Sequence, residues 1–184
     1  MKGERRMEFV KFNKIPRLSR KCIITEKIDG TNAQLCITEE GEMLIGSRTR
    51  WITPQDDNYG FARWATENKE ELMKLGEGNH FGEWWGQGIQ RRYGMDKKVF
   101  SLFNTSRWSD PEIRPKCCSV VPVLYEGLFD TNAISDTLTR LEVNGSVASA
   151  GFMKPEGIVV FHAQSRLMFK KTIEKDEQPK GLAT

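Results

Sequence analysis

One lysine-centred run, Glu26-Lys27-Ile28-Asp29-Gly30-Thr31-Asn32, constrains this chain more than any other feature. It follows the apolar residues 22–24, which predicts that Lys27 stands where a strand gives way to a turn. A lysine at such a position can act as a covalent nucleophile beside the Asp29 carboxylate, and Gly30 would let a phosphate approach the backbone. An isolated Lys-x-Asp-Gly run is more often an ordinary turn, so its interpretation depends on the segments that follow.

The composition indicates a folded protein without a membrane span. The 184 residues include ten phenylalanines and five tryptophans within an apolar share of 38%, which is enough to form a core. No apolar run approaches the ~20 residues that cross a bilayer. Four cysteines without a Cys-x-x-Cys pair, and only two histidines, argue against a zinc site and favour reduced thiols in a cytoplasmic setting.

Hydrophobic periodicity predicts an α+β fold. Strands are expected at residues 22–27, 32–38, 42–48, 79–85, 98–104, 119–126, 157–162 and 166–171. Amphipathic helices are expected at residues 60–75, ended by Gly76, and at 132–142, capped by Gly145. The turn 39–41 would join two strands into an antiparallel hairpin. Because hairpins and single helices make the connections, we expect mainly antiparallel sheets flanked by helices in a single domain spanning residues 1–184.

Five further segments carry charged or aromatic residues in, or at the ends of, expected strands. They are Ser47-Arg48, Phe81-Gly82-Glu83-Trp84-Trp85-Gly86, Phe100-Ser101-Leu102-Phe103-Asn104, Pro155-Glu156-Gly157-Ile158-Val159-Val160 and Leu167-Met168-Phe169-Lys170-Lys171. A carboxylate beside buried apolar residues is costly unless it is paired or binds a metal. Glu83 and Glu156 therefore favour a functional role, whereas Trp84 and Trp85 are expected to pack.

In this order the six segments resemble the nucleotidyltransferase motifs of ATP-dependent DNA and RNA ligases and mRNA-capping enzymes. The chain is most similar to the RNA ligase 2-like family, through the forms Glu-Lys-x-Asp-Gly-Thr-Asn and Gly-Glu-Trp-Trp-Gly-x-Gly-Ile-Gln. The resemblance runs from Glu26 to about Lys171 and implies an ATP-grasp-like nucleotidyltransferase (adenylylation) domain. No C-terminal accessory domain is evident, so we expect a minimal catalytic domain, a truncated chain, or reliance on a partner protein or domain for further substrate contacts.

The resemblance implies that Lys27 attacks the α-phosphorus of ATP, expels pyrophosphate and forms a lysyl-N–AMP phosphoramidate. It also implies a nucleotide-binding set comprising Glu26, Asp29, Gly30, Asn32, Arg48, Glu83, Phe103, Glu156, Lys170 and Lys171. In that set Phe103 would stack on adenine, Lys170 would bind the α-phosphate, and Arg48, rather than Arg50, would lie near the ribose and the substrate end. The carboxylates of Asp29, Glu83 and Glu156 would hold Mg²⁺ directly or through water.

The implied chemistry requires positive charge around the lysine. A lysine amine is protonated and non-nucleophilic at neutral pH, so cations such as Lys170 and Mg²⁺ would favour its neutral form and offset charge on the α-phosphate. Many relatives carry a second lysine in the last motif where this chain has Thr172, so either Lys171 substitutes or the register of the motif shifts by one residue. Phe100 is expected to stack on adenine less readily than Phe103, because residues three apart on a strand point to opposite sides, although both rings could belong to the core.

The resulting hypothesis is an ATP-dependent RNA ligase that joins 5′-phosphate and 3′-hydroxyl ends through lysyl-AMP and an adenylylated 5′ end. Nicked or single-stranded RNA ends are the expected substrates. The candidate contacts to the phosphate backbone are Arg91, Arg92, Lys97 and Lys98. Three alternatives stay open: a DNA ligase, a GTP-using capping-type nucleotidyltransferase, and a non-catalytic nucleic-acid-binding module.

Overall fold

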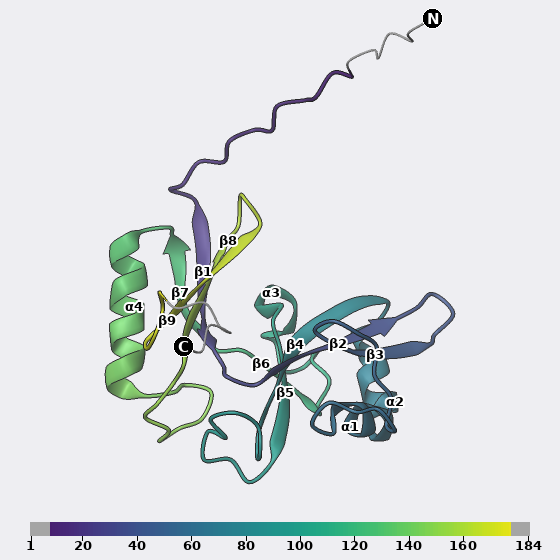
Figure 1. Ribbon diagram of the computed structural model, residues 1–184. Helices are drawn as coiled ribbons and strands as arrows, with labels where there is room; N and C mark the ends of the chain where they lie inside the picture. Colours follow the sequence, from purple (N-terminus) through teal and green to yellow (C-terminus); the bar gives the residue numbers. More distant parts are fainter. Residues whose placement is uncertain (1–7, 178–184) are drawn as a thin grey trace, which may run out of the picture.

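The computed structural model describes residues 8–177, which form two β-sheets joined by the turn after Lys27 (Figure 1). The four-stranded sheet is antiparallel, with the order β7-β1-β8-β9. Its strands are β1 (Lys21–Lys27), β7 (Val123–Leu128), β8 (Gly157–His162) and β9 (Leu167–Thr172). Helix α4 (Thr131–Asn144) covers one face of this sheet, and Ile24, Ile158 and Leu141 pack between them.

The five-stranded sheet has the order β3-β2-β4-β5-β6, antiparallel except for the β5–β6 pair. Its strands are β2 (Thr31–Ile37), β3 (Met43–Ser47), β4 (Gly78–Gly86), β5 (Lys98–Leu102) and β6 (Cys118–Val120). Three short helices cover one face: α1 (Phe61–Glu67), α2 (Lys69–Leu72) and η1 (Met73–Leu75). The buried core on that face includes Leu35, Trp84, Phe100, Phe61 and Leu72. These helices do not cover the opposite face of this sheet, which we call its open face.

A third apolar cluster supports the junction between the two sheets. Ile28, directly after Lys27, packs with Trp85, Tyr93 and Val121, all of them buried. This packing fixes the path of the chain from β1 into β2. The candidate lysine therefore sits at a well-anchored junction between two sheets.

The single strand expected at 119–126 is wrong, because the chain divides there into β6 and β7, which belong to different sheets. Pro122 lies between them and has no N–H to donate to a continuous ladder. Its carbonyl accepts from the Glu26 N–H at 3.0 Å, while the Val121 N–H donates to the Leu102 carbonyl at 3.1 Å. The chain therefore passes from the five-stranded sheet to the four-stranded sheet at Pro122.

Two other expected elements differ from the prediction: one strand is shorter, and one helix is divided into segments. The strand expected at 98–104 ends at Leu102, since the Asn104 side chain caps helix α3 (Thr105–Trp108) by accepting from the Arg107 N–H at 3.2 Å. The helix expected at 60–75 is interrupted at Asn68, whose side chain donates to the Trp64 carbonyl at 2.8 Å and competes with helix continuation. Gly76 ends this region as predicted.

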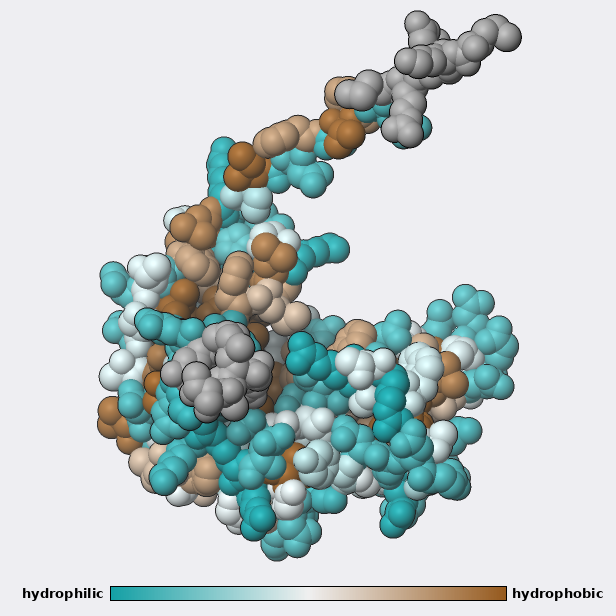
Figure 2. Space-filling view, viewed as in Figure 1, coloured by the Kyte–Doolittle hydropathy of each residue, from teal (hydrophilic) through white to brown (hydrophobic). Residues whose placement is uncertain are grey.

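The remaining predictions are confirmed within one or two residues, including the 39–41 hairpin turn and the helix that Gly145 ends with a φ of 83°. The α+β class with mainly antiparallel sheets is also confirmed. Residues 8–20 form an extended arm that leaves the four-stranded sheet (Figure 1). Phe9 and Phe12 in this arm are exposed, and Figure 2 shows hydrophobic side chains along it. In the part of the chain that the structure describes, no helix is long and apolar enough to span a membrane.

Candidate active site

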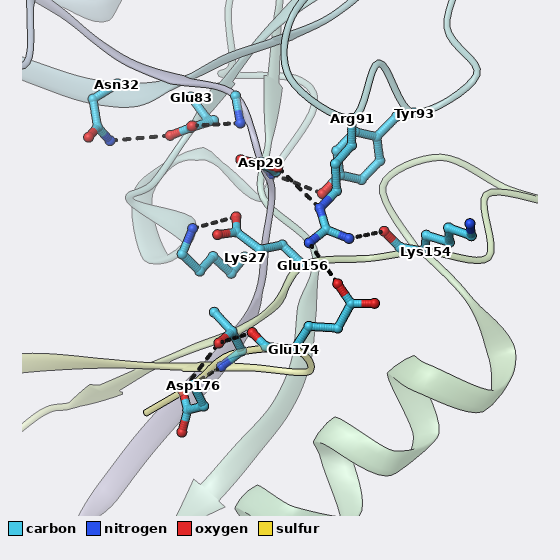
Figure 3. A network of polar contacts seen from close by, with 12 residues as sticks. Lys27, Asp29, Asn32, Glu83, Arg91, Tyr93, Lys154, Glu156, Glu174 and Asp176 are labelled. Carbon is cyan, nitrogen blue, oxygen red and sulfur yellow. Dashed lines mark hydrogen bonds and ion pairs between the residues drawn. The ribbon is translucent and has the colours of Figure 1, made fainter. Parts of the chain in front are cut away.

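Lys27 is the last residue of β1, and strand alternation puts it on the opposite face from Ile24, which packs against α4. Its Nζ lies 2.5 Å from Oε2 of Glu156 (Figure 3). Glu156 directly precedes β8, whose first residue, Gly157, pairs with Lys27. The two side chains are 18% and 5% exposed. A single amine is thereby held against a buried carboxylate at the junction of the sheets.

Glu83 supplies a second buried carboxylate, on the face of the five-stranded sheet opposite its core. It lies opposite Asn32 in the β2–β4 pair, and its Oε2 accepts from Asn32 Nδ2 at 3.2 Å. Its Oε1 accepts from the Gly30 N–H at 3.0 Å (Figure 3). Burial raises the pKa of Glu83 to about 7, although the nearby charge of Lys27 acts to lower it. This carboxyl group therefore changes charge near neutral pH.

Gly30 is required by packing at this junction. A Cβ at this position would lie 2.5 Å from the Trp84 carbonyl oxygen and 2.7 Å from Cβ of Trp85. Such contacts are too close for any side chain, so the turn approaches β4 only because residue 30 is glycine. Close backbone packing is sufficient to explain the glycine at this position. The expected role of Gly30 in giving a phosphate access to the backbone stays a prediction.

Asp29 is held by the loop between β4 and β5 and not by Lys27. Its Oδ2 accepts from Nε of Arg91 at 3.1 Å, and its backbone N–H donates to Oη of Tyr93 at 2.9 Å (Figure 3). Arg91 also donates from Nη1 to the Lys154 carbonyl at 3.1 Å, two residues before Glu156. Burial raises the pKa of the Tyr93 phenol, which therefore stays a neutral hydroxyl. Arg91 and Tyr93 thus position the turn that carries Lys27.

The Glu26 side chain faces away from Lys27, and this placement does not support the expected contribution of Glu26 to the nucleotide site. It is 1% exposed on the α4 side of β1. Its carboxylate accepts from Ser146 Oγ at 2.6 Å and from the N–H groups of Val147 and Ala148 at 2.8 and 2.9 Å. Three donors satisfy this buried charge, so Glu26 fixes the loop after α4.

The register of β9 separates the two lysines of the last motif. Lys170 pairs with Val159, which pairs with Thr25, two residues before Lys27, so Lys170 belongs to the Lys27 face. Lys171 is on the other face, and its Nζ lies 3.4 Å from Asp176. This placement does not support the substitution by Lys171, because Lys170 is the lysine of the two that lies on the Lys27 face.

Arg48 and Phe103 lie at strand ends on the five-stranded sheet. Arg48 is exposed after β3, and its side chain makes no hydrogen bond or ion pair with any residue between 8 and 177. Arg50, its rival in the sequence, is paired with Asp56. Phe103 is 38% exposed, whereas Phe100 is fully buried in the core, so Phe103 is the ring of the two that a ligand can reach.

The expected carboxylate set for a metal does not assemble as a ligand cluster. Among the described residues no group of three His, Cys, Asp or Glu side chains is arranged to hold an ion. Asp29 is engaged by Arg91, which leaves Glu83 and Glu156 nearest to Lys27. Arg91 was expected at the RNA backbone and is instead turned inward. The one feature in the sequence that could have indicated this position is the glycine-punctuated loop 86–94, which contains Arg91.

Comparison with solved structures shows a shared fold. Similar chains are an apo mutant of an RNA ligase from Naegleria gruberi at 20% identity, and two further mutants of that organism's RNA ligase at 19% identity, one with AMP and Mn and one with ATP and Mn. Each has a TM-score of 0.61 and covers 84% of this chain but 50% of the other. The chain thus spans about half the length of these proteins. No curated protein matches it in sequence.

A family model provides the broader assignment. The model described as RNA ligase matches residues 20–175, which include β1 through β9 and every residue of the site described above. Because that match covers most of the sequence, this chain belongs to the RNA ligase family.

Proposed function

We propose that this chain is the nucleotidyltransferase domain of an ATP-dependent RNA ligase, with Lys27 as the residue that becomes adenylylated. The observation that carries the proposal is the Lys27 amine, held 2.5 Å from the Glu156 carboxylate at the junction of two sheets in a chain of the RNA ligase family. Similar solved chains include mutants with ATP and Mn and with AMP and Mn, which supports a nucleotide as the ligand.

In the first step the Lys27 amine loses a proton and attacks the α-phosphorus of ATP. A P–N bond forms, the P–O bond to the β-phosphate breaks, and pyrophosphate carries away the bonding electron pair. Glu156, in hydrogen-bond contact with Nζ, is the group able to accept the proton. Lys170, on the same face of the four-stranded sheet, supplies positive charge to the phosphate oxygens as negative charge develops on them.

The nucleotide would lie between the sheets, on the open face of the five-stranded sheet. Exposed Phe103 offers a ring for adenine, and Asn32 and Arg48 stand at the β2–β3 end of the same sheet. Asp29 and Gly30 act through the backbone of the turn, since the first is held by Arg91 and the second packs on β4. We leave Glu26 and Lys171 out of this site.

The carboxylates of this site fit a divalent cation only if the ion keeps bound water and is shared with the phosphates of ATP. Mg²⁺ takes oxygen ligands, keeps several waters and is commonly bound through one or two carboxylates together with substrate phosphates. Glu83 and Glu156 could hold such a hydrated ion jointly with ATP, whereas a cage made of protein ligands alone is not available among residues 8–177. When bound, the ion would supply charge that stabilises the phosphate oxygens.

The later steps follow from the same phosphoramidate. AMP passes from Lys27 to an RNA 5′-phosphate, which breaks the P–N bond and forms a pyrophosphate linkage. An RNA 3′-hydroxyl then attacks the activated 5′-phosphate, closes the phosphodiester and releases AMP.

The test is incubation with α-labelled ATP and Mg²⁺, followed by denaturation and separation of the protein. Wild type is expected to keep the label, and Lys27→Ala is expected to keep none. Equal labelling of both would move the nucleophile elsewhere, and labelling of neither would remove the proposal. Labelled GTP offered in parallel distinguishes a capping-type enzyme, and matched RNA and DNA nicks distinguish the two ligase classes.

A further inference from the structure

Three exposed aromatic side chains follow one another across the open face of the five-stranded sheet. Gln34 on β2 pairs with Gly46 on one side and with Phe81 on the other, so these positions share a face. Trp51 bridges to Gly46, and a Cβ on Gly46 would lie 3.0 Å from its Cε3. Phe103 adjoins Phe81, donating its N–H to the Phe81 carbonyl at 2.9 Å. We call Trp51, Phe81 and Phe103 the aromatic row.

The aromatic row runs beside the candidate active site. Asn32 and Glu83, which form the adjacent row, are two residues from Gln34 and Phe81 along the same strands. Two residues on a strand correspond to ~7 Å, so the aromatic row lies one step from the Glu83 carboxylate of the candidate active site.

The exposure of these rings is unusual for aromatic residues. Trp51 and Phe81 are 52% and 53% exposed, whereas Trp84, Trp85 and Trp108 are all buried. Trp51 makes no ring–ring or cation–π contact with residues between 8 and 177. Large exposed aromatic surfaces that line a site mark places where a ligand binds.

Arg48, a cation without a partner among residues 8–177, accompanies Trp51. The tight turn from Ser47 to Arg50 brings Trp51 back over Gly46, with the Ser47 N–H donating to the Arg50 carbonyl at 2.8 Å. Arg48 lies in this turn, and its side chain has no ion-pair or hydrogen-bond partner within the described range. An open aromatic face next to a free guanidinium suits a nucleotide, because the ring stacks on the base and the cation contacts its phosphate.

The aromatic row is too long for one base. The Trp51 ring lies over Gly46 on β3, and three inter-strand spacings, or ~14 Å, separate β3 from β5, which Phe103 directly follows. Adenine stacked on Phe103, as in the proposed function, would leave Trp51 uncovered. We propose that Trp51 is a stacking site for a nucleobase of the single-stranded RNA end, with Phe81 extending the surface toward the ATP site. This inference rests on the proposed function, since it names where the substrate of that reaction binds.

The test measures RNA binding separately from adenylylation. A short fluorescein-labelled single-stranded RNA with a 5′-phosphate is titrated with wild type, Trp51→Ala and Trp51→Phe, and each protein is also labelled with α-labelled ATP. Trp51→Ala removes one base stack and is expected to weaken RNA binding about tenfold, which corresponds to ~1.4 kcal/mol. Trp51→Phe is expected to retain most of the affinity, and both variants should label with AMP at the wild-type rate.

Val143→Ala is the matched control, because Val143 is an apolar residue, 67% exposed, on helix α4. Its RNA affinity is expected to equal that of wild type. Wild-type affinity in Trp51→Ala, equal losses in Trp51→Phe and Trp51→Ala, or a parallel fall in AMP labelling would each overturn the stacking assignment. A wild-type protein that binds RNA through Trp51 but takes no label would instead remove the proposed ligase function and keep the binding site.

Discussion

Arg91 donates from Nε to Oδ2 of Asp29 across 3.1 Å, although 62 residues separate them in the sequence. The same guanidinium donates from Nη1 to the carbonyl of Lys154 at 3.1 Å and lies 3.9 Å from the Glu174 carboxylate. One arginine of the β4–β5 loop therefore links the turn after Lys27, the segment before Glu156 and the segment after β9. These are the three parts of the chain that bring the proposed catalytic groups together.

Loss of the Arg91 contacts should slow adenylylation while the protein stays folded. We expect Arg91→Ala to reduce the rate of AMP labelling by about tenfold, because a misplaced nucleophile loses part of its orientation advantage. Arg91→Lys should recover little, since one ammonium cannot reproduce the planar set of donors. Arg92→Ala is the control, because Arg92 is the exposed neighbour in the same loop. Equal effects of the two alanine variants on the labelling rate would disprove a positioning role for Arg91.

The pKa of Glu83, raised to about 7, predicts a pH dependence of stability. Between about pH 4.5 and 7 the folded state holds a proton on this group that the unfolded state has lost. The stabilisation is therefore complete below pH 4.5 and disappears as the pH rises through 7. Urea unfolding of the nucleotide-free protein should show a decrease of roughly 1–3 kcal/mol over this window from Glu83. Glu83→Gln should flatten that part of the curve, and an unchanged slope would show that Glu83 titrates normally.

Gly30→Ala should destabilise the fold and impair the site together. The new Cβ would meet the Trp84 carbonyl at 2.5 Å, a backbone atom that cannot move aside cheaply. We expect a loss of about 3 kcal/mol in the free energy of unfolding, at the upper end for overpacking, with much slower AMP labelling. Gly41→Ala is the comparison, since Gly41 has open space around it and only its φ of +78° resists a side chain. That variant should lose about 1 kcal/mol and label normally.

The Glu26–Ser146 hydrogen bond should matter for stability and not for ATP binding. Ser146→Ala removes a 2.6 Å donor from a buried carboxylate, for an expected loss of about 1–3 kcal/mol in the free energy of unfolding. Glu26→Gln should cost a similar amount, and the double variant should cost less than the sum, because both act on one contact. The KM for ATP should stay at its wild-type value throughout. A raised KM in Glu26→Gln would return Glu26 to the nucleotide site.

The sequence alone determined the local parts of this protein. Alternating apolar residues predict β1, the hairpin of β2 and β3, and the β8–β9 pair, because strand and turn preferences act over a few residues. The motif order also identified Lys27 and Glu156, and in the fold Nζ of Lys27 lies 2.5 Å from Oε2 of Glu156. Because these preferences are averaged over several residues, the predictions were wrong where a single residue redirects the chain, as at Pro122 and Asn104.

Tertiary structure alone decided which way each charged side chain faces and what it meets. Glu26 and Lys27 are adjacent in the motif, yet strand alternation sends one to the loop after α4 and the other to Glu156. The same alternation separates Lys170 from Lys171. Arg91 reaches Asp29, and Trp51 covers Gly46, through contacts between strands and loops that are distant in sequence. Local pattern contains no information on such pairings, because they depend on how two sheets pack and in which register their strands align.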